Sequence, residues 1–176
     1  MENLEVKSGA KIGGIFDVKC FRKGELIWEE KGHNLLTYEG LDATLNIMLH
    51  GATQITAWYC LLFEDDYTPL ATNTYAVPGF TETTSYDEGT RPAYVEAEST
   101  ARSTTNSASP AVFTISATKT MYGAALVGGG TDADTKADTA GGGTLFCLFS
   151  FALERAVLDN DVINLTYTIT IADDGV

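Results

Sequence analysis

Apolar and polar residues alternate along much of this chain, which is the pattern of half-buried β-strands. The alternation is clearest near the end, where Ile163, Leu165, Tyr167, Ile169 and Ile171 are separated by Asn or Thr. Turn residues such as Asp159-Asn160-Asp161 separate the segments. The pattern predicts strands at residues 16–20, 26–29, 55–63, 81–86, 93–96, 111–116, 121–127, 144–153 and 162–171.

One segment has helical spacing instead, and it predicts a short helix over about residues 38–50. Thr37 is a suitable N-cap and Gly51 suits the position after the last turn. The apolar stripe is one-sided and consists of Leu41, Leu45, Met48 and Leu49. We therefore expect this helix to lie on an apolar surface.

Many short strands with a single helix predict an all-β protein, a jelly-roll-like β-sandwich. The Ser/Thr/Asn-rich residues 101–110 and the Gly-rich residues 128–143 are expected to be loops, the second a flexible surface loop. We divide the chain into an N-terminal hairpin or docking arm, residues 1–32, and a β-sandwich domain, residues 33–176. On this division, a chain without residues 1–32 folds but no longer attaches to its partner.

The charge is strongly acidic and unevenly placed. Acidic residues outnumber basic ones 24 to 11, which gives a net charge of −13 and argues against nucleic acid as a partner. Residues 1–33 hold six bases and six acids, so the whole excess follows His33, and the neutral leading segment suits docking. No apolar run reaches the roughly 18 residues of a membrane span. The first residues do not resemble a signal peptide, so we expect synthesis in the cytoplasm.

The residues that usually carry chemistry do not form a recognisable site. Cys20, Cys60 and Cys147 lie in separate apolar runs, which predicts buried free thiols. His33 and His50 lie in no catalytic or zinc motif. We interpret His33 as a turn residue or a surface contact, and His50 as a cation at the C-terminal end of the helix. The acidic positions Asp132, Asp134 and Asp138 lack the glycine and closing glutamate of a calcium loop, and Glu64-Asp65-Asp66 is interpreted as a solvated strand end. We therefore expect no catalytic residue, cofactor or metal.

Several motifs in order resemble a family of small structural proteins of tailed bacteriophages, the capsid cement (decoration) proteins. The run His33-Asn34-Leu35-Leu36-Thr37-Tyr38-Glu39-Gly40-Leu41 resembles the opening of that family. The later motifs are Trp58-Tyr59-Cys60, Gly79-Phe80-Thr81-Glu82, Tyr86–Tyr94, Asn106-Ser107-Ala108, Tyr122–Leu126 and Asp159–Ile171. Residues 1–32 fall outside the family pattern, and the acidic loop 132–138 is longer than usual.

This resemblance implies a structural virion protein rather than an enzyme. Such a protein is assembled in the host bacterial cytoplasm, binds the outside of the capsid and bridges major capsid protein subunits. It also implies self-association, with a homotrimer favoured over a homodimer. The alternative is a tail, neck or fibre component that binds host glycan through Trp58, Tyr86 or Tyr94, and a glycan-processing enzyme is a more distant third.

Overall fold

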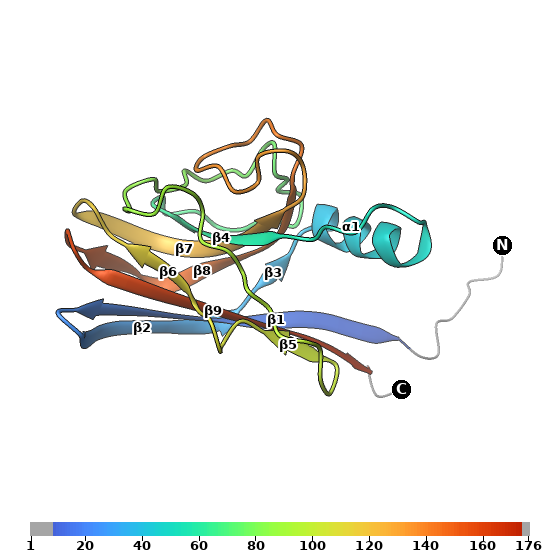
Figure 1. Cartoon of the computed structure of the whole chain (residues 1–176), viewed down its shortest axis with the longest axis horizontal. Coiled ribbons are helices and arrows are strands. Elements are labelled where there is room, and N and C mark those ends of the chain that lie inside the picture. Colours follow the sequence, from blue (N-terminus) through green and yellow to red (C-terminus); the bar gives the residue numbers. More distant parts are fainter. Residues whose placement is uncertain (1–8, 174–176) are drawn as a thin grey trace.

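The computed structural model describes residues 9–173, and it folds as two antiparallel sheets packed face to face (Figure 1). Sheet A contains β1 (Ala10–Arg22), β2 (Glu25–His33), β5 (Ser103–Thr105), β6 (Ala111–Thr114) and β9 (Val162–Asp173). Sheet B contains β3 (Leu35–Leu36), β4 (Trp58–Phe63), β7 (Lys119–Gly128) and β8 (Thr144–Val157). The one helix in this part of the chain is α1 (Tyr38–Leu49). The predicted β-sandwich with one short helix is confirmed.

The space between the sheets is filled by the alternating apolar residues that predicted the strands. Phe16 of β1 stacks on Tyr167 of β9, with ring centroids 4.4 Å apart, and on Phe149 of β8. Cys20, Cys60 and Cys147 are all buried free thiols, as predicted. Burial raises the pKa of Cys20 and Cys147 to about 12, which keeps both thiols protonated and unreactive near neutral pH.

Sheet B is covered on both faces, whereas sheet A is covered on one. A second apolar cluster lies on the outer side of sheet B, where Phe80 and Tyr75 pack over Leu61 and Leu145. These two aromatic residues belong to the long connection between β4 and β5, and the loop between β7 and β8 lies beside it (Figure 1). The outer side of sheet A has no such cover in Figure 1. The outer side of sheet B is therefore covered by loops, whereas the outer side of sheet A is exposed.

Some short strand predictions were wrong. Residues 81–86 and 93–96 form isolated bridges rather than strands, because Glu82, Tyr86 and Ala93 each pair with another segment at a single position. The first predicted buried strand begins at Trp58 rather than at residue 55. Part of the predicted loop 101–110 forms the short strand β5 on the edge of sheet A.

The predicted hairpin at the N-terminal end exists, with its turn at Lys23 and Gly24, and it is part of the sandwich. β1 lies inside sheet A, paired with β2 on one side and with β9 on the other. Its residues Phe16 and Val18 are fully buried in the main core. Residues 10–32 therefore belong to the same sandwich as residues 33–173. Residues 1–8 of the predicted arm lie outside the described residues.

The predicted helix is confirmed at both ends, but not in what it packs against. Thr37 caps α1 by accepting a hydrogen bond from the Gly40 N–H, and Gly51 has the positive φ of +73° that ends the helix. Gly40 is the only buried residue of α1. In the apolar stripe, Leu41 is half-buried and Leu45, Met48 and Leu49 are exposed, so the expected apolar cover is not supplied by the described part of this chain. Within residues 9–173, the structure contains no helix able to span a membrane.

An ion pair ties the end of β1 to the turn before β9. Arg22 Nε and Nη2 donate to the two carboxylate oxygens of Asp161, each at 2.7 Å. Asp161 is fully buried and also accepts a hydrogen bond from the Leu158 N–H at 2.8 Å. The hydrogen bonds from Arg22 hold the pKa of Asp161 below its usual value, so this carboxylate stays ionised in the folded chain.

Replacing this carboxylate is expected to give a pH-dependent loss of stability. Asp161→Asn should lower the free energy of unfolding by about 1–3 kcal/mol at neutral pH. Because the folded pKa is depressed, the contribution is complete above the unfolded-state pKa of about 3.9 and is lost as pH falls through the folded value. Urea unfolding should therefore show the two proteins converging below about pH 4. The exposed neighbour Asp159 supplies the control Asp159→Asn; a difference that persists unchanged into strong acid would contradict this account.

Candidate functional site

The start of α1 is fastened to β8 by residues of the first motif. Thr37 is fully buried, and its hydroxyl donates to the backbone carbonyl of Leu145. Its N–H donates to the carbonyl of Phe146 at 3.1 Å. A Cβ added to Gly40 would lie 2.5 Å from the same Phe146 carbonyl oxygen, so glycine allows the helix to approach the strand this closely. The helix start is therefore held by both hydrogen bonds and close packing.

Glu39 adds a second attachment to the same place. One of its carboxylate oxygens accepts the Leu145 N–H at 2.6 Å and the Tyr75 N–H at 2.8 Å. The N–H of Tyr38 donates to the carbonyl of Ala71 at 2.8 Å. The first turn of α1 is thus bound to β8 and to the loop that covers sheet B. The sequence identified the cap at Thr37 but gave no sign of these longer-range partners.

The second half of α1 carries three large exposed apolar side chains. Leu45, Met48 and Leu49 are 56%, 68% and 79% exposed. We call these three residues the α1 surface. In Figure 1 the helix projects from the end of the sandwich at which β1 begins and β9 ends. The anchored first turn therefore holds an apolar surface out into solvent.

The outer side of sheet A is a second exposed surface, with a different character. Asp17, Lys19, Glu29 and Lys31 point to this side from β1 and β2 and form a network, in which Lys19 lies 3.4 Å from both Asp17 and Glu29. The outward residues of β9 are uncharged, namely Asn164, Thr166, Thr168 and Thr170. We call these eight residues the sheet A face. It is polar and carries balanced charge, in contrast to the acidic chain as a whole.

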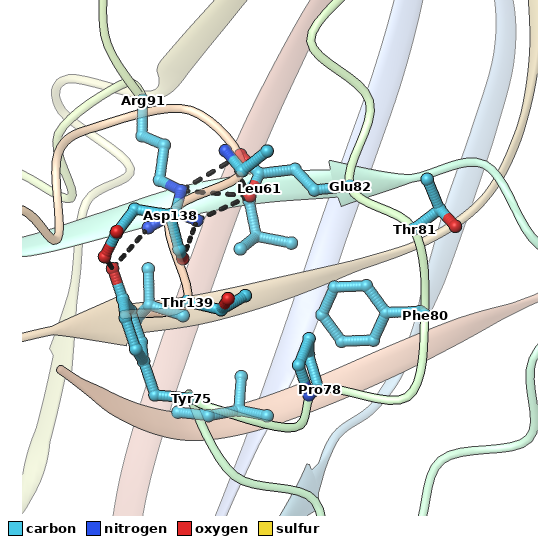
Figure 2. A pocket seen from close by; sticks show the side chains of 12 residues that line it. Leu61, Tyr75, Pro78, Phe80, Thr81, Glu82, Arg91, Asp138 and Thr139 are labelled. Atoms are coloured by element: carbon cyan, nitrogen blue, oxygen red, sulfur yellow. Dashed lines mark hydrogen bonds and ion pairs between the residues drawn. The ribbon is translucent and has the colours of Figure 1, made fainter. Parts of the chain in front are cut away.

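A cavity of about 250 Å³ lies on the opposite side of the molecule, under the loops that cover sheet B (Figure 2). Its apolar lining comes from strand residues Leu61, Val127 and Leu145 and from the loop residues Pro78 and Phe80. Figure 2 shows a polar group of side chains gathered along one side of the cavity.

Arg91 is the centre of that group, and all five of its N–H donors are used. Nε and Nη2 donate to the carboxylate of Glu82, with a shortest distance of 2.6 Å. Nη1 donates to the Tyr75 hydroxyl and to the carbonyl of Ala133, both at 3.0 Å. Nη2 also donates to the carbonyl of Asp138 at 3.0 Å. All of these acceptors belong to the loops that cover sheet B, so Arg91 fastens the loops to one another with every one of its donors.

The remaining bonds complete this arginine clasp, which we define as Arg91, Glu82, Tyr75 and Asp138. The Tyr75 hydroxyl donates to the Asp138 carboxylate at 2.8 Å, and the Ala137 N–H donates to Glu82 at 3.1 Å. Burial raises the pKa of Glu82, and its hydrogen bonds with Arg91 oppose that rise. The Tyr75 hydrogen bond lowers the pKa of Asp138, while burial raises the pKa of Tyr75 to about 12. The clasp thus holds a buried ion pair in the loops that cover sheet B.

The acidic loop that the sequence singled out is held by this clasp, so the interpretation as a flexible surface loop needs correction. Besides the bonds at Asp138, the backbone carbonyl of Asp134 accepts a hydrogen bond from the backbone N–H of Arg91 at 2.7 Å. Lys136 donates to the Tyr86 carbonyl at 2.6 Å and lies 3.8 Å above the centre of the Tyr86 ring. The hydroxyl of Thr131 donates to Asp132 at 2.8 Å. These contacts give the polar residues of the loop structural partners.

The other candidate residues are dispersed. Tyr86 and Tyr94 are buried, and Trp58 packs edge-on against Phe146, so these aromatic rings do not form an exposed stacking platform for a glycan. His33 ends β2 and His50 follows α1, and both are exposed. Within the described range, no three His, Cys, Asp or Glu side chains are placed to hold a metal ion. The predicted strand-end cluster is paired, since Glu64 binds Lys119 at 3.0 Å and Asp65 accepts the Thr81 N–H at 2.7 Å.

The fold and these surfaces define the class of protein: an antiparallel β-sandwich with a covered face, a bare polar face and an anchored helix that projects from one end. No protein-family model matches the chain, and no curated protein is significantly similar to it.

Proposed function

We propose that this chain is a cement protein of a tailed-phage capsid, which binds the outside of the shell and bridges neighbouring major capsid protein subunits. The observation that carries the proposal is the ordered series of motifs from His33 to Ile171 that resembles this family. Their residues build the frame of the molecule: Thr37 and Gly40 anchor α1, and Arg91 fastens the loops. A rigid frame that presents exposed surfaces suits a protein whose task is binding.

The sheet A face is the surface that we assign to the capsid. It is built on regular strands, which hold its side chains in fixed positions, and its charges are already balanced by the pairs around Asp17 and Lys19. Contact through this face leaves the loops with the acidic clusters at Asp65 and Asp132 on the other side of the sandwich, away from the shell. The excess negative charge then stays in solvent, where it costs least.

Binding of this kind stabilises a shell by mass action. A protein that binds neighbouring subunits only when they are joined favours the joined state by its free energy of binding. No chemical step is needed, and the stabilisation rises with the concentration of free protein. This is the mechanism that we propose for the chain.

Charging the sheet A face is expected to weaken capsid binding. Asn164→Glu with Thr166→Glu places two carboxylates at its centre, next to Asp17, and should raise the Kd for purified capsids at least about tenfold. The test is co-sedimentation with capsids that lack the chain. Thr72→Glu with Ala76→Glu is the matched control, because both positions are exposed on the loop over sheet B and the net charge changes equally. Equal binding by the two variants would contradict the assignment of this face.

A further inference from the structure

The cavity under the loops that cover sheet B is large enough to hold a small molecule. Its volume is about 250 Å³, and an apolar cavity of about 150 Å³ is already enough to bind benzene. Leu61, Val127 and Leu145 line it from the strands and are almost completely buried. Pro78 and Phe80 add apolar surface from the loop (Figure 2). Such a lining suits an apolar molecule, because it offers water few hydrogen-bond partners.

The walls of this cavity are held in place, so the space is formed before a ligand arrives. The arginine clasp fastens the loops along one side. Phe80 stacks on Phe63 of β4, with ring centroids 4.7 Å apart. The N–H groups of Tyr75 and Leu145 both donate to the Glu39 carboxylate. A preformed cavity favours binding, because little freedom of the protein is lost when the ligand enters.

The polar groups of the lining favour an uncharged ligand. Arg91 uses all of its donors on Glu82, Tyr75 and loop carbonyls. The Asp138 carboxylate accepts hydrogen bonds from the Tyr75 hydroxyl and the Gly141 N–H. A charged ligand would lose its water without finding a free counter-charge.

One side of the cavity offers a single polar contact. Thr81, Ala137 and Thr139 belong to the lining and are exposed, so the cavity opens to solvent beside them. The Thr139 hydroxyl has no hydrogen-bond partner in the part of the chain that the structure describes. A ligand with a polar group at one end can therefore place it at this opening.

We propose that the cavity binds a small uncharged aromatic molecule with one hydrogen-bonding group, of the kind represented by indole. The rings of Phe80 and Tyr75 in the lining favour an aromatic occupant over an aliphatic one, because ring–ring contacts add to the burial of apolar area. The polar group of the ligand faces Thr139. The inference goes beyond capsid binding, since the cavity lies on the side of the sandwich opposite the sheet A face.

The test is a titration of the purified full-length chain with indole, followed by two-dimensional proton–nitrogen NMR spectra. Saturable binding is expected, with a Kd below about 1 mM and with the largest shifts at Leu61, Val127 and Leu145. Val127→Phe places a ring in the cavity and should raise the Kd for indole at least about tenfold. Val112→Phe is the matched control, because it makes the same substitution at an exposed position of β6. The control is expected to keep the wild-type Kd.

A second variant keeps the test valid if Val127→Phe alters the circular dichroism spectrum. Thr139→Phe then replaces it, with the same expected rise in Kd, because the added ring obstructs the opening. An exposed loop position accepts a larger side chain with little effect on folding. Thr135→Phe is its control, since Thr135 is exposed on the same loop and does not line the cavity.

Two results would overturn the inference. One is the absence of saturable shifts up to the solubility limit of indole. The other is a folded cavity variant that binds indole as tightly as the wild type. A chain that binds capsids but not indole would overturn this inference alone, whereas a chain that binds indole but not capsids would contradict only the proposed cement function.

Discussion

A chain that lacks residues 1–32 is expected not to fold. The deletion removes β1 from the inside of sheet A and leaves β9 without its longest partner. It also removes the buried side chains of Phe16, Val18, Cys20 and Trp28 from the core. At about 1.5–3 kcal/mol for each of these four side chains, the loss is roughly 6–12 kcal/mol. A domain of this kind has a total stability of about 5–15 kcal/mol, so little or none would remain.

Circular dichroism and a thermal melt of the truncated chain measure this directly. We expect no cooperative transition, and recovery of the β-sheet spectrum when residues 1–32 are added back as a separate peptide. A truncated chain with a native spectrum and a cooperative melt would show that these residues are the separable arm that their neutral charge suggested. Attachment to capsids can be attributed to these residues only after this measurement.

Arg91→Met is expected to give the largest effect of any single substitution considered for this chain. The variant keeps most of the side-chain volume but removes five donors and leaves the carboxylate of Glu82 buried without its ion pair. Breaking a buried ion pair on one side costs about 3–5 kcal/mol. The loop from residue 128 to 143 also loses its attachment through Ala133 and Asp138. Urea unfolding followed by intrinsic fluorescence should therefore show a much lower midpoint.

The pH dependence of this variant separates the buried charge from the lost packing. Without Arg91, burial raises the folded pKa of Glu82 further, and only the hydrogen bond from the Ala137 N–H and the charge of Lys136 still oppose that rise. The loss of stability caused by the unpaired Glu82 carboxylate is then largest above the folded pKa of Glu82. It is relieved as pH falls toward the unfolded value of about 4.3. The deficit of Arg91→Met should be smaller at about pH 5 than at about pH 8. The control Arg102→Met, at an exposed arginine, should stay within about 0.5 kcal/mol of wild type; an equal loss in both variants would contradict the role of the clasp.

The sequence predicted the elements whose signal is local. The alternation from Ile163 to Ile171 identified β9, and the cap at Thr37 with the glycine at 51 identified α1 nearly to its ends. The strand predictions for residues 81–86 and 93–96 were wrong because alternation indicates only that one side of a segment is buried. It carries no information on how many backbone hydrogen bonds the segment makes to a neighbouring strand. Glu82 and Ala93 each meet β4 at one position only.

The surfaces and the clasp could not be predicted, because their partners are distant in sequence. Arg91 looks like any arginine in a loop until the fold brings Tyr75, Glu82 and Asp138 around it. The stripe of α1 predicted an apolar contact, but periodicity alone does not tell whether the cover belongs to the same chain.

The number of copies of this chain per purified particle, relative to the major capsid protein, tests the cement proposal most directly. Quantitative mass spectrometry of the particles gives this ratio without any assumption about the binding surface. A protein that bridges capsid subunits over the whole shell is expected at a ratio near one per capsid subunit. A ratio of a few per cent would contradict the proposal and indicate a tail, neck or fibre component, and absence from the particle would contradict any structural role in the virion.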